Sequence, residues 1–206
     1  MIVSSVACAL PASPLSNDDV VDLVVTNSRK GFIGDIEMMR SRLKARLERT
    51  GAKNRYWRAG EPILDLVDAA VRQALSEASL ALTAIDLLIY ASVDKSFIEP
   101  ANACFIAKAL GTPSVRTFDV TDACLGWFTA TQVADGLMRL GVVEHALIVN
   151  VECPMDKGGS IYPSAFTVLH PSELAWKFSG LTFGEAVTAT ILSHDGRITK
   201  SKLAEA

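Results

Sequence analysis

The sequence predicts an α/β fold. Apolar runs of strand length alternate with longer segments of helical periodicity from one end of the chain to the other. Half of the 206 residues are hydrophobic, so the chain can bury a core without disulfides or metals. The length allows one large domain or two small ones, and the unbroken alternation favours a single domain over residues 1–206.

The first third of the chain supplies one strand and three helices. Residues 2–9 are apolar and form the first expected strand. Asn17 can cap a helix over 18–25, because its side-chain oxygen can accept from amides of the first turn. Apolar residues recur at helical spacing over 35–48 and 62–79, and the second of these helices has a proline at its start.

The middle of the chain continues the alternation. Residues 85–91 form a continuous apolar run, which is typical of a strand covered on both faces. A helix over 101–110, a short strand over 115–120, a long helix over 125–140 and a strand over 145–151 follow. A glycine directly follows each of these two helices, as expected for residues that close a helix.

The segment from about 154 to 181 breaks this rhythm. It contains Gly158-Gly159, Pro163 and Pro171, and we expect an irregular insertion or lid. A last strand is expected at 186–192, followed by a hairpin turn at Asp195-Gly196.

Composition excludes several classes of function. Twenty Lys+Arg against twenty-three Asp+Glu give a net charge of −3, so no global positive field favours nucleic acid or anionic lipid. No stretch approaches the roughly 18 apolar residues of a membrane span. The mean hydropathy of +0.28 indicates that some apolar surface is covered by another subunit or another half of the same fold.

Four widely spaced cysteines, Cys8, Cys104, Cys124 and Cys153, form no C-x-x-C pair and have no histidine at ligand spacing. This pattern argues against a zinc site and against a secreted disulfide scaffold. The start of the chain lacks the basic region of a signal peptide. We therefore expect a reduced, cytoplasmic protein without a metal.

Cys124 is the strongest candidate for chemistry. It lies where the strand ending near Val120 turns into a helix, and there the helix dipole and unpaired backbone amides favour thiolate over thiol. Gly126 removes a side chain close to the sulfur, which would let a substrate carbonyl approach. The residues alone also allow the alternative that Cys124 is a small buried hydrophobic residue.

Four segments resemble one family. The run Asp119-Val-Thr-Asp-Ala-Cys124-Leu-Gly-Trp127 resembles the nucleophile segment of β-ketoacyl-acyl-carrier-protein synthase III and its thiolase-fold relatives. The segment from Arg49-Thr-Gly51 to Arg55 resembles the family's Arg-Thr-Gly-Ile-Arg segment, and 85–92 followed by Pro100–Cys104 resembles its next strand and dimer-side helix. Phe183-Gly184-Glu185-Ala186 resembles the stretch that closes the family's first half.

The resemblance implies a thiolase-like fold of which this chain is the first, nucleophile-bearing half, with a buried helix following the cysteine. Cys124 would accept an acyl group from a thioester of coenzyme A or of phosphopantetheine on an acyl carrier protein, with no permanently bound cofactor. The condensing histidine and asparagine of the family belong to the second half, and His145, His170 and His194 do not match them. A homodimer, or pairing with a chain that supplies the second half, is therefore expected.

The resemblance also implies substrate-binding residues. Arg49 keeps the family position in a run of eight basic residues between Arg40 and Arg58, which would attract a pantetheine phosphate or an acidic carrier protein. Ala45 replaces the aromatic residue that stacks on adenine in the family. Glu99 replaces a hydrophobic residue that enters the neighbouring acyl pocket. An acyl group other than the acetyl starter, short or polar, is expected.

Two other interpretations stay open. The chain could be a non-catalytic scaffold that pairs with an active relative, with Cys124 merely buried. It could also be a truncated product or an excised domain, and the helix over 125–140 would then leave apolar surface exposed.

Overall fold

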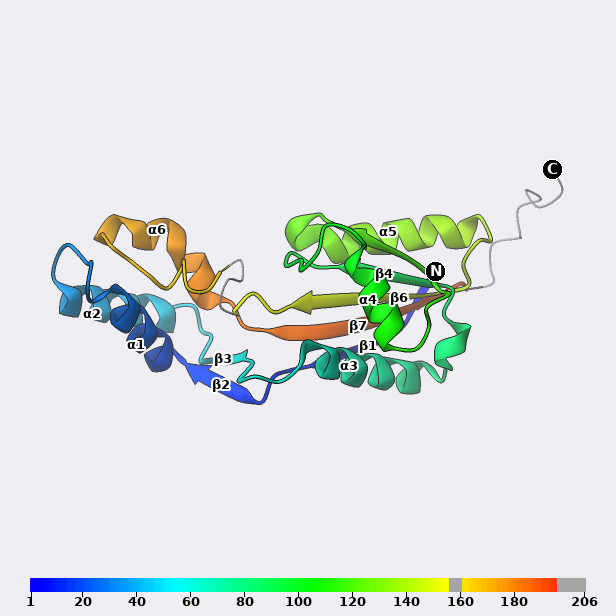
Figure 1. Ribbon diagram of the computed structural model, residues 1–206, viewed down its shortest axis with the longest axis horizontal. Coiled ribbons are helices and arrows are strands. Elements are labelled where there is room, and N and C mark those ends of the chain that lie inside the picture. The colour runs from blue at the N-terminus through cyan, green and yellow to red at the C-terminus, as the bar shows by residue number, and fades with distance from the viewer. Residues whose placement is uncertain (156–160, 196–206) are drawn as a thin grey trace. The chain divides into compact units, whose positions relative to one another are not determined.

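The computed structural model describes residues 1–155 and 161–195, and these residues group into two compact units (Figure 1). Among the described residues, the sheet unit consists of Met1–Ala9, Pro62–Glu152 and 186–195, and the helical unit consists of Leu10–Glu61, 153–155 and 161–185. The Gly158-Gly159 pair of the expected insertion and residue Gly196 of the expected hairpin turn lie outside the described residues. The single domain with a lid at about 154–181 stays a prediction.

The sheet unit is built on a mixed five-stranded sheet in the order β1-β7-β6-β4-β5. β1 pairs antiparallel with β7 and β7 antiparallel with β6, whereas β4 is parallel to both β6 and β5. All five residues of β4 are buried, as its apolar sequence predicts for a central strand. The strands are β1 (Ile2–Ala9), β4 (Leu87–Ala91), β5 (Arg116–Val120), β6 (His145–Glu152) and β7 (Ala186–Ser193).

Helices cover both faces of this sheet (Figure 1). α3 (Ile63–Ala78) packs on β1 and β7, and α5 (Gly126–Arg139) packs on the opposite face against β4, β5 and β6. α4 (Asn102–Ala109) packs beside β4 and β5, and a short 3-10 helix spans Leu82–Ala84. Ala130, Ala134 and Met138 of α5 enter the core, so the expected amphipathic helices are confirmed.

Two glycines end their helices as predicted. Gly111 after α4 and Gly141 after α5 have φ of +82° and +69°, the left-handed region that glycine adopts without strain. The backbone amides of Gly111 and Thr112 donate to the last carbonyls of α4. These bonds satisfy carbonyls that would otherwise lack a donor at the helix end.

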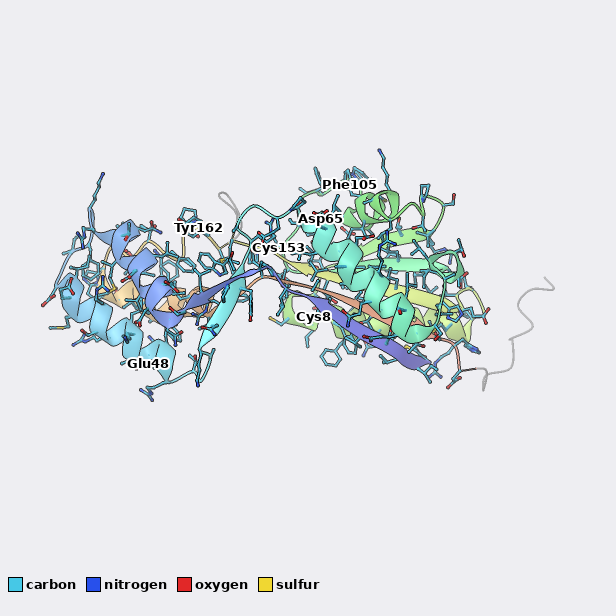
Figure 2. The ribbon with its side chains drawn as sticks, turned by 90° about the horizontal axis from the view of Figure 1, so that it is seen from below. Cys8, Glu48, Asp65, Phe105, Cys153 and Tyr162 are labelled. Carbon is cyan, nitrogen blue, oxygen red and sulfur yellow. The ribbon has the colours of Figure 1, made fainter. Side chains whose placement is uncertain are left out.

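The helical unit has its own core around Phe166. Val20, Val24, Leu43 and Leu47 come from α1 (Asn17–Ser28) and α2 (Ile36–Glu48) and are fully buried around it. Figure 2 shows Tyr162 in this unit, and the Tyr162 ring lies 5.7 Å from that of Phe166. The other elements are the two-stranded sheet of β2 (Ser13–Ser16) and β3 (Asn54–Trp57), α6 (Leu174–Lys177), and 3-10 helices at Pro171–Glu173 and Phe178–Thr182.

The segment 161–181 contains α6 and the 3-10 helix Pro171–Glu173, and it packs into the core of the helical unit. Phe166, Val168 and Leu181 are fully buried in the core of the helical unit. The sequence pattern could not show this, because the three apolar residues follow neither a helical nor a strand period.

The capping prediction for α1 was wrong by one residue. Ser16, not Asn17, is the N-cap, and its hydroxyl accepts from the Asp19 amide while the Asp19 carboxylate accepts from the Ser16 amide. The Asn17 side chain donates to the Ala52 carbonyl and accepts from the Arg55 guanidinium. Both residue types can cap a helix, and these contacts commit Asn17 elsewhere.

Candidate functional site

Cys124 lies at a sharp change of chain direction. β5 ends at Val120, a 3-10 turn spans Ala123–Leu125, and α5 begins at Gly126. Ala123 has a φ of +42°, a conformation that costs a non-glycine residue free energy and is concentrated at functional sites. Cys124 is exposed and forms no disulfide. It is therefore not the small buried residue that the sequence also allowed.

Cys124 lies just before the start of α5 and close in sequence to two acidic residues. The sulfur-bearing residue lies two positions before the first turn of α5, where the helix dipole is positive. The two nearby acidic residues are held by other donors. Asp122 accepts from the Thr129 hydroxyl at 2.5 Å, and Asp119 accepts from the amides of Asn102 and Ala103 at 2.9 and 3.0 Å. Their negative charge is therefore partly offset by groups other than the thiol.

Gly126 is buried at the start of α5. A Cβ atom built there would lie 3.7 Å from the backbone carbon and oxygen of Ala91, the last residue of β4. This is ordinary van der Waals contact, so an alanine would fit here and the approach of α5 to β4 does not require glycine. Its part in admitting a substrate carbonyl remains a proposal.

Glu99 lies in the segment between β4 and α4 and is exposed. Its neighbour Ile98 is 99% exposed, so the tip of this segment projects away from the sheet unit. β4 and β5 are parallel, with Ala91 opposite Val120. The segment that carries Glu99 and the turn that carries Cys124 therefore leave the same edge of the sheet.

Asn102 and Asp119 connect that segment to β5, and the sequence analysis did not identify this link. Asn102 donates through its Nδ2 to both Asp119 and the Phe97 carbonyl, and its Oδ1 accepts from the Ser96 amide. Lys95 Nζ lies 3.6 Å from the Asp119 carboxylate. The carboxylate that precedes Cys124 by five residues thus fixes the base of the segment that presents Glu99.

Glu152, at the end of β6, holds the beginning of the same segment. Its carboxylate accepts from the Val93 amide at 2.9 Å, and burial raises its pKa above the ordinary value. The Tyr90 hydroxyl donates to the Asp94 carbonyl at 2.5 Å, and burial raises the pKa of Tyr90 as well. The sequence offers a signal for Glu152, namely a carboxylate that directly follows the apolar run of β6 and Asn150-Val151.

Four of the eight residues of the predicted basic patch are paired with carboxylates or buried. Arg40 and Lys44 pair with Asp22 and Asp18 of α1 at 2.6 and 2.7 Å. Arg55 is 4% exposed, and burial lowers its pKa. Arg58 is also buried, beside the equally buried carboxylate of Glu185.

Four of the eight basic residues are exposed and form no ion pair with a carboxylate in the part of the chain that the structure describes: Arg42, Arg46, Arg49 and Lys53. Arg49 directly follows α2 as its C-cap. It belongs to the helical unit, whereas Cys124, Gly126 and Glu99 belong to the sheet unit.

Each of the three histidines takes part in a hydrogen bond within its own unit. His145 Nδ1 lies 2.9 Å from the Ser193 hydroxyl, and His170 caps a 3-10 turn through Ser172. The His194 amide donates to the Glu144 carbonyl.

The described residues contain neither a metal-ligand cluster nor a membrane-spanning helix. Over 1–155 and 161–195 there is no group of three His, Cys, Asp or Glu residues placed to hold a metal ion. Within the same ranges, every helix is too short or too polar to cross a membrane.

The chain is similar in sequence to known proteins. A scan against models of protein families finds no match. The sequence is 37% identical over 145 residues to β-ketoacyl-[acyl-carrier-protein] synthase III of Thiobacillus denitrificans, covering 69% of this chain and 41% of that protein. It is 32% identical over 185 residues to the synthase III of Desulfitobacterium hafniense, covering 85% of this chain and 51% of that protein.

Solved structures show the same architecture. A cysteine-to-serine variant of Xanthomonas campestris OleA, crystallised with lauric acid and lauroyl-CoA, superposes with a TM-score of 0.75 at 21% identity. The match covers 93% of this chain and 56% of OleA. An acetamide-bound OleA structure gives the same TM-score and identity. The chain thus spans about half the length of the proteins that it matches in sequence and in structure.

The predicted resemblance and fold are confirmed: the chain is similar in sequence to β-ketoacyl-[acyl-carrier-protein] synthase III, has a thiolase-like fold, and corresponds to about half of such a protein.

Proposed function

We propose that this chain is the nucleophile-bearing half of a condensing acyltransferase, and that Cys124 accepts an acyl group from an acyl thioester. The donor is a thioester of coenzyme A or of an acyl carrier protein, and no cofactor is held permanently. The chain forms a homodimer or pairs with a chain that supplies the second half. Only the second arrangement brings the groups that complete condensation or transfer in fatty-acid or polyketide-type biosynthesis.

The observation that carries this proposal is an exposed Cys124 between a left-handed Ala123 and the start of α5. In the proposed step the Cys124 thiolate attacks the thioester carbonyl carbon, a new sulfur–carbon bond forms, and the carrier leaves as its thiolate, which takes up a proton. Backbone amides near the start of α5 would hold the negative charge that develops on the carbonyl oxygen.

The acyl group is proposed to differ from the acetyl starter. Glu99 places a carboxylate at an exposed tip where the family often has a hydrophobic residue, which favours a short or polar acyl group. Ala45 offers no ring for stacking on adenine, so Arg49 would contribute to donor binding through charge. The OleA structure with lauroyl-CoA provides a second acyl class to compare.

An apolar face on α5 supports the need for a second half. Leu125 and Phe128 are each 58% exposed, and Val133 and Leu140 are exposed on the same helix or directly after it. Large apolar side chains gathered at a surface mark a contact site. The opposite face of α5 is buried in the sheet unit, so the expected buried helix is covered on one side only within this chain.

The test is acylation of the isolated chain, read by intact mass. Wild type incubated with acetyl-CoA, succinyl-CoA or lauroyl-CoA should gain one acyl adduct, and the reaction should then stall. Cys124→Ala should gain none, whereas Cys104→Ala should react like wild type, because Cys104 is also exposed but lies within α4. An adduct that persists in Cys124→Ala, or a folded wild type that stays unmodified with all three donors, contradicts the proposal.

The scaffold alternative is tested by the alkylation rates of the exposed cysteines. A nucleophilic Cys124 should be alkylated faster than Cys8 and Cys104 in the folded chain. Equal labelling of the three exposed cysteines favours the non-catalytic subunit.

A further inference from the structure

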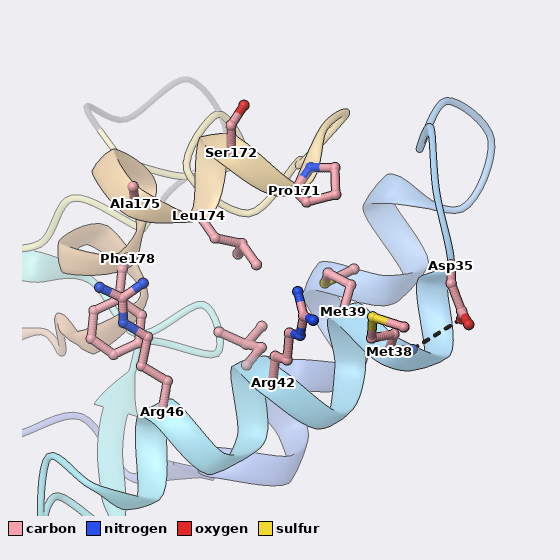
Figure 3. Close-up of a pocket in the computed structure, with 11 residues that line it drawn as sticks. Asp35, Met38, Met39, Arg42, Arg46, Pro171, Ser172, Leu174, Ala175 and Phe178 are labelled. Atoms are coloured by element: carbon pink, nitrogen blue, oxygen red, sulfur yellow. Dashed lines mark hydrogen bonds between the residues drawn. The ribbon is translucent and has the colours of Figure 1, made fainter.

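The helical unit contains a pocket that the proposed acyl transfer does not use. It lies between α2 and the residues around α6, has a volume of about 270 Å³, and is drawn in Figure 3. The apolar side chains of its wall are Met38, Met39, Leu43, Pro171, Leu174, Ala175 and Phe178. Figure 3 shows Leu174 directed from the α6 side towards α2, opposite Arg42.

Two guanidinium groups give this apolar pocket a positive charge. Arg42 and Arg46 line it, and neither forms an ion pair with a carboxylate of the described residues. Arg46 lies 4.4 Å from the centre of the Phe178 ring, a cation–π contact that leaves its charge uncompensated. The basic residues on the other side of α2, Arg40 and Lys44, are neutralised by α1.

The polar groups of the pocket are already engaged. Asp35, the one carboxylate among the lining residues, accepts from the amides of Glu37 and Met38 as the N-cap of α2. The Ser172 hydroxyl bonds to His170. A nucleotide base would therefore find few free hydrogen-bonding partners, whereas an aliphatic chain would find methionine, leucine and proline walls.

We propose that this pocket binds a medium-chain aliphatic carboxylate, with its carboxylate on Arg42 and Arg46 and its chain along Met39, Leu43 and Leu174. The volume corresponds to about nine water molecules at roughly 30 Å³ each, which is room for a chain of about eight carbons. Charge-assisted bonds from guanidinium groups select a carboxylate over a neutral or cationic head group.

Titration calorimetry with octanoate tests this site on the full chain. Binding is expected to strengthen about fourfold for each methylene from hexanoate to octanoate, because each added group leaves water. Octylamine is expected not to bind. Equal binding of octylamine, or tighter binding of adenosine 3′,5′-bisphosphate than of octanoate, would overturn the assignment.

Three variants locate the binding. Arg42→Gln and Arg46→Gln should each weaken octanoate at least tenfold, because each removes a charge-assisted bond. Arg40→Gln is the matched control, since it removes a charge from the same helix that Asp22 already neutralises, and its affinity should equal that of wild type. An affinity that is unchanged by Arg42→Gln and Arg46→Gln in folded protein overturns the proposal.

Cys124→Ala separates this inference from the proposed acyl transfer. It should keep octanoate binding even if it abolishes acylation, because every lining residue belongs to the helical unit. Loss of octanoate binding in Cys124→Ala would move the ligand to the thiol site and overturn the pocket assignment without affecting the proposed function.

Discussion

The residues proposed to take part in acyl transfer lie at the carboxyl ends of the parallel strands, and residues beside them lower the stability of the fold. Ala123 is held in a left-handed conformation that costs an alanine about 1–2 kcal/mol, and it directly precedes the exposed Cys124. Glu152 keeps a carboxylate half-buried at the end of β6, where burial raises its pKa. Both features oppose stability, and both adjoin the edge from which Cys124 and Glu99 emerge.

The raised pKa of Glu152 predicts a pH-dependent stability difference. The folded state favours the protonated carboxyl, so its contribution is complete below the ordinary pKa of 4.5 and is lost as pH rises through the raised value. Glu152→Gln keeps an acceptor for the Val93 amide and cannot ionise. Its stability relative to wild type should therefore increase between pH 4.5 and 7, measured by urea unfolding at each pH. Glu144→Gln, at an exposed position, is the control, and a difference that does not change with pH for Glu152→Gln would contradict the expectation.

At the scale of elements, residues close in sequence define where the helices begin and end. Gly111 and Gly141 close α4 and α5 because their left-handed backbone suits glycine. α1 begins instead with a reciprocal pair, Ser16 and Asp19, in which each side chain satisfies a backbone amide of the other. The helix start is thus stabilised by two residues three positions apart.

Removal of this pair should weaken the helical unit measurably. Ser16→Ala is expected to lower the free energy of unfolding by about 1 kcal/mol, because the Asp19 amide loses its acceptor at the helix start. Ser16→Thr retains the hydroxyl and should lose less than half as much. Chemical denaturation of the three proteins provides the comparison. Equal stability of Ser16→Ala and wild type would show that the capping box contributes nothing.

At the scale of the whole molecule, the chain leaves apolar surface without a cover. Leu125, Phe128 and Leu140 are exposed along and beside α5, and the proteins that the chain resembles are about twice as long.

The isolated chain should therefore self-associate through α5. Phe128→Lys is expected to shift the sedimentation coefficient toward that of a monomer at micromolar concentration, with little change in the melting temperature, because residue 128 is exposed. Ile33→Lys is the matched control, since Ile33 is a similarly exposed apolar residue of the helical unit. If both variants or neither reduce association, α5 is not the contact surface.

Much of this structure follows from local sequence. The five strands of the sheet unit, the longer amphipathic helices, the closing glycines and the strand–turn–helix around Cys124 were predicted, because each depends on periodicity or on the conformational range of one residue. β2 and β3 were missed, because each has only four residues and shows no alternating apolar pattern. β2 also contains Pro14. The buried position of Phe166 was missed for the same reason.

Other features were decided only by tertiary contacts. Ser16 and Asn17 are equally suitable caps by residue type, and contacts with Ala52 and Arg55 determined which one serves. Eight basic residues appear as one patch in the sequence, but α1 carboxylates and burial remove four of them from the exposed, unpaired set. The sequence by itself determined the order of the strands and helices of the sheet unit and the place of Cys124 between a strand and a helix, because these depend on backbone preference and hydrophobic period. The tertiary structure decided which charges remain unpaired and which carboxylates are buried, because electrostatic free energy depends on distances between residues far apart in the chain.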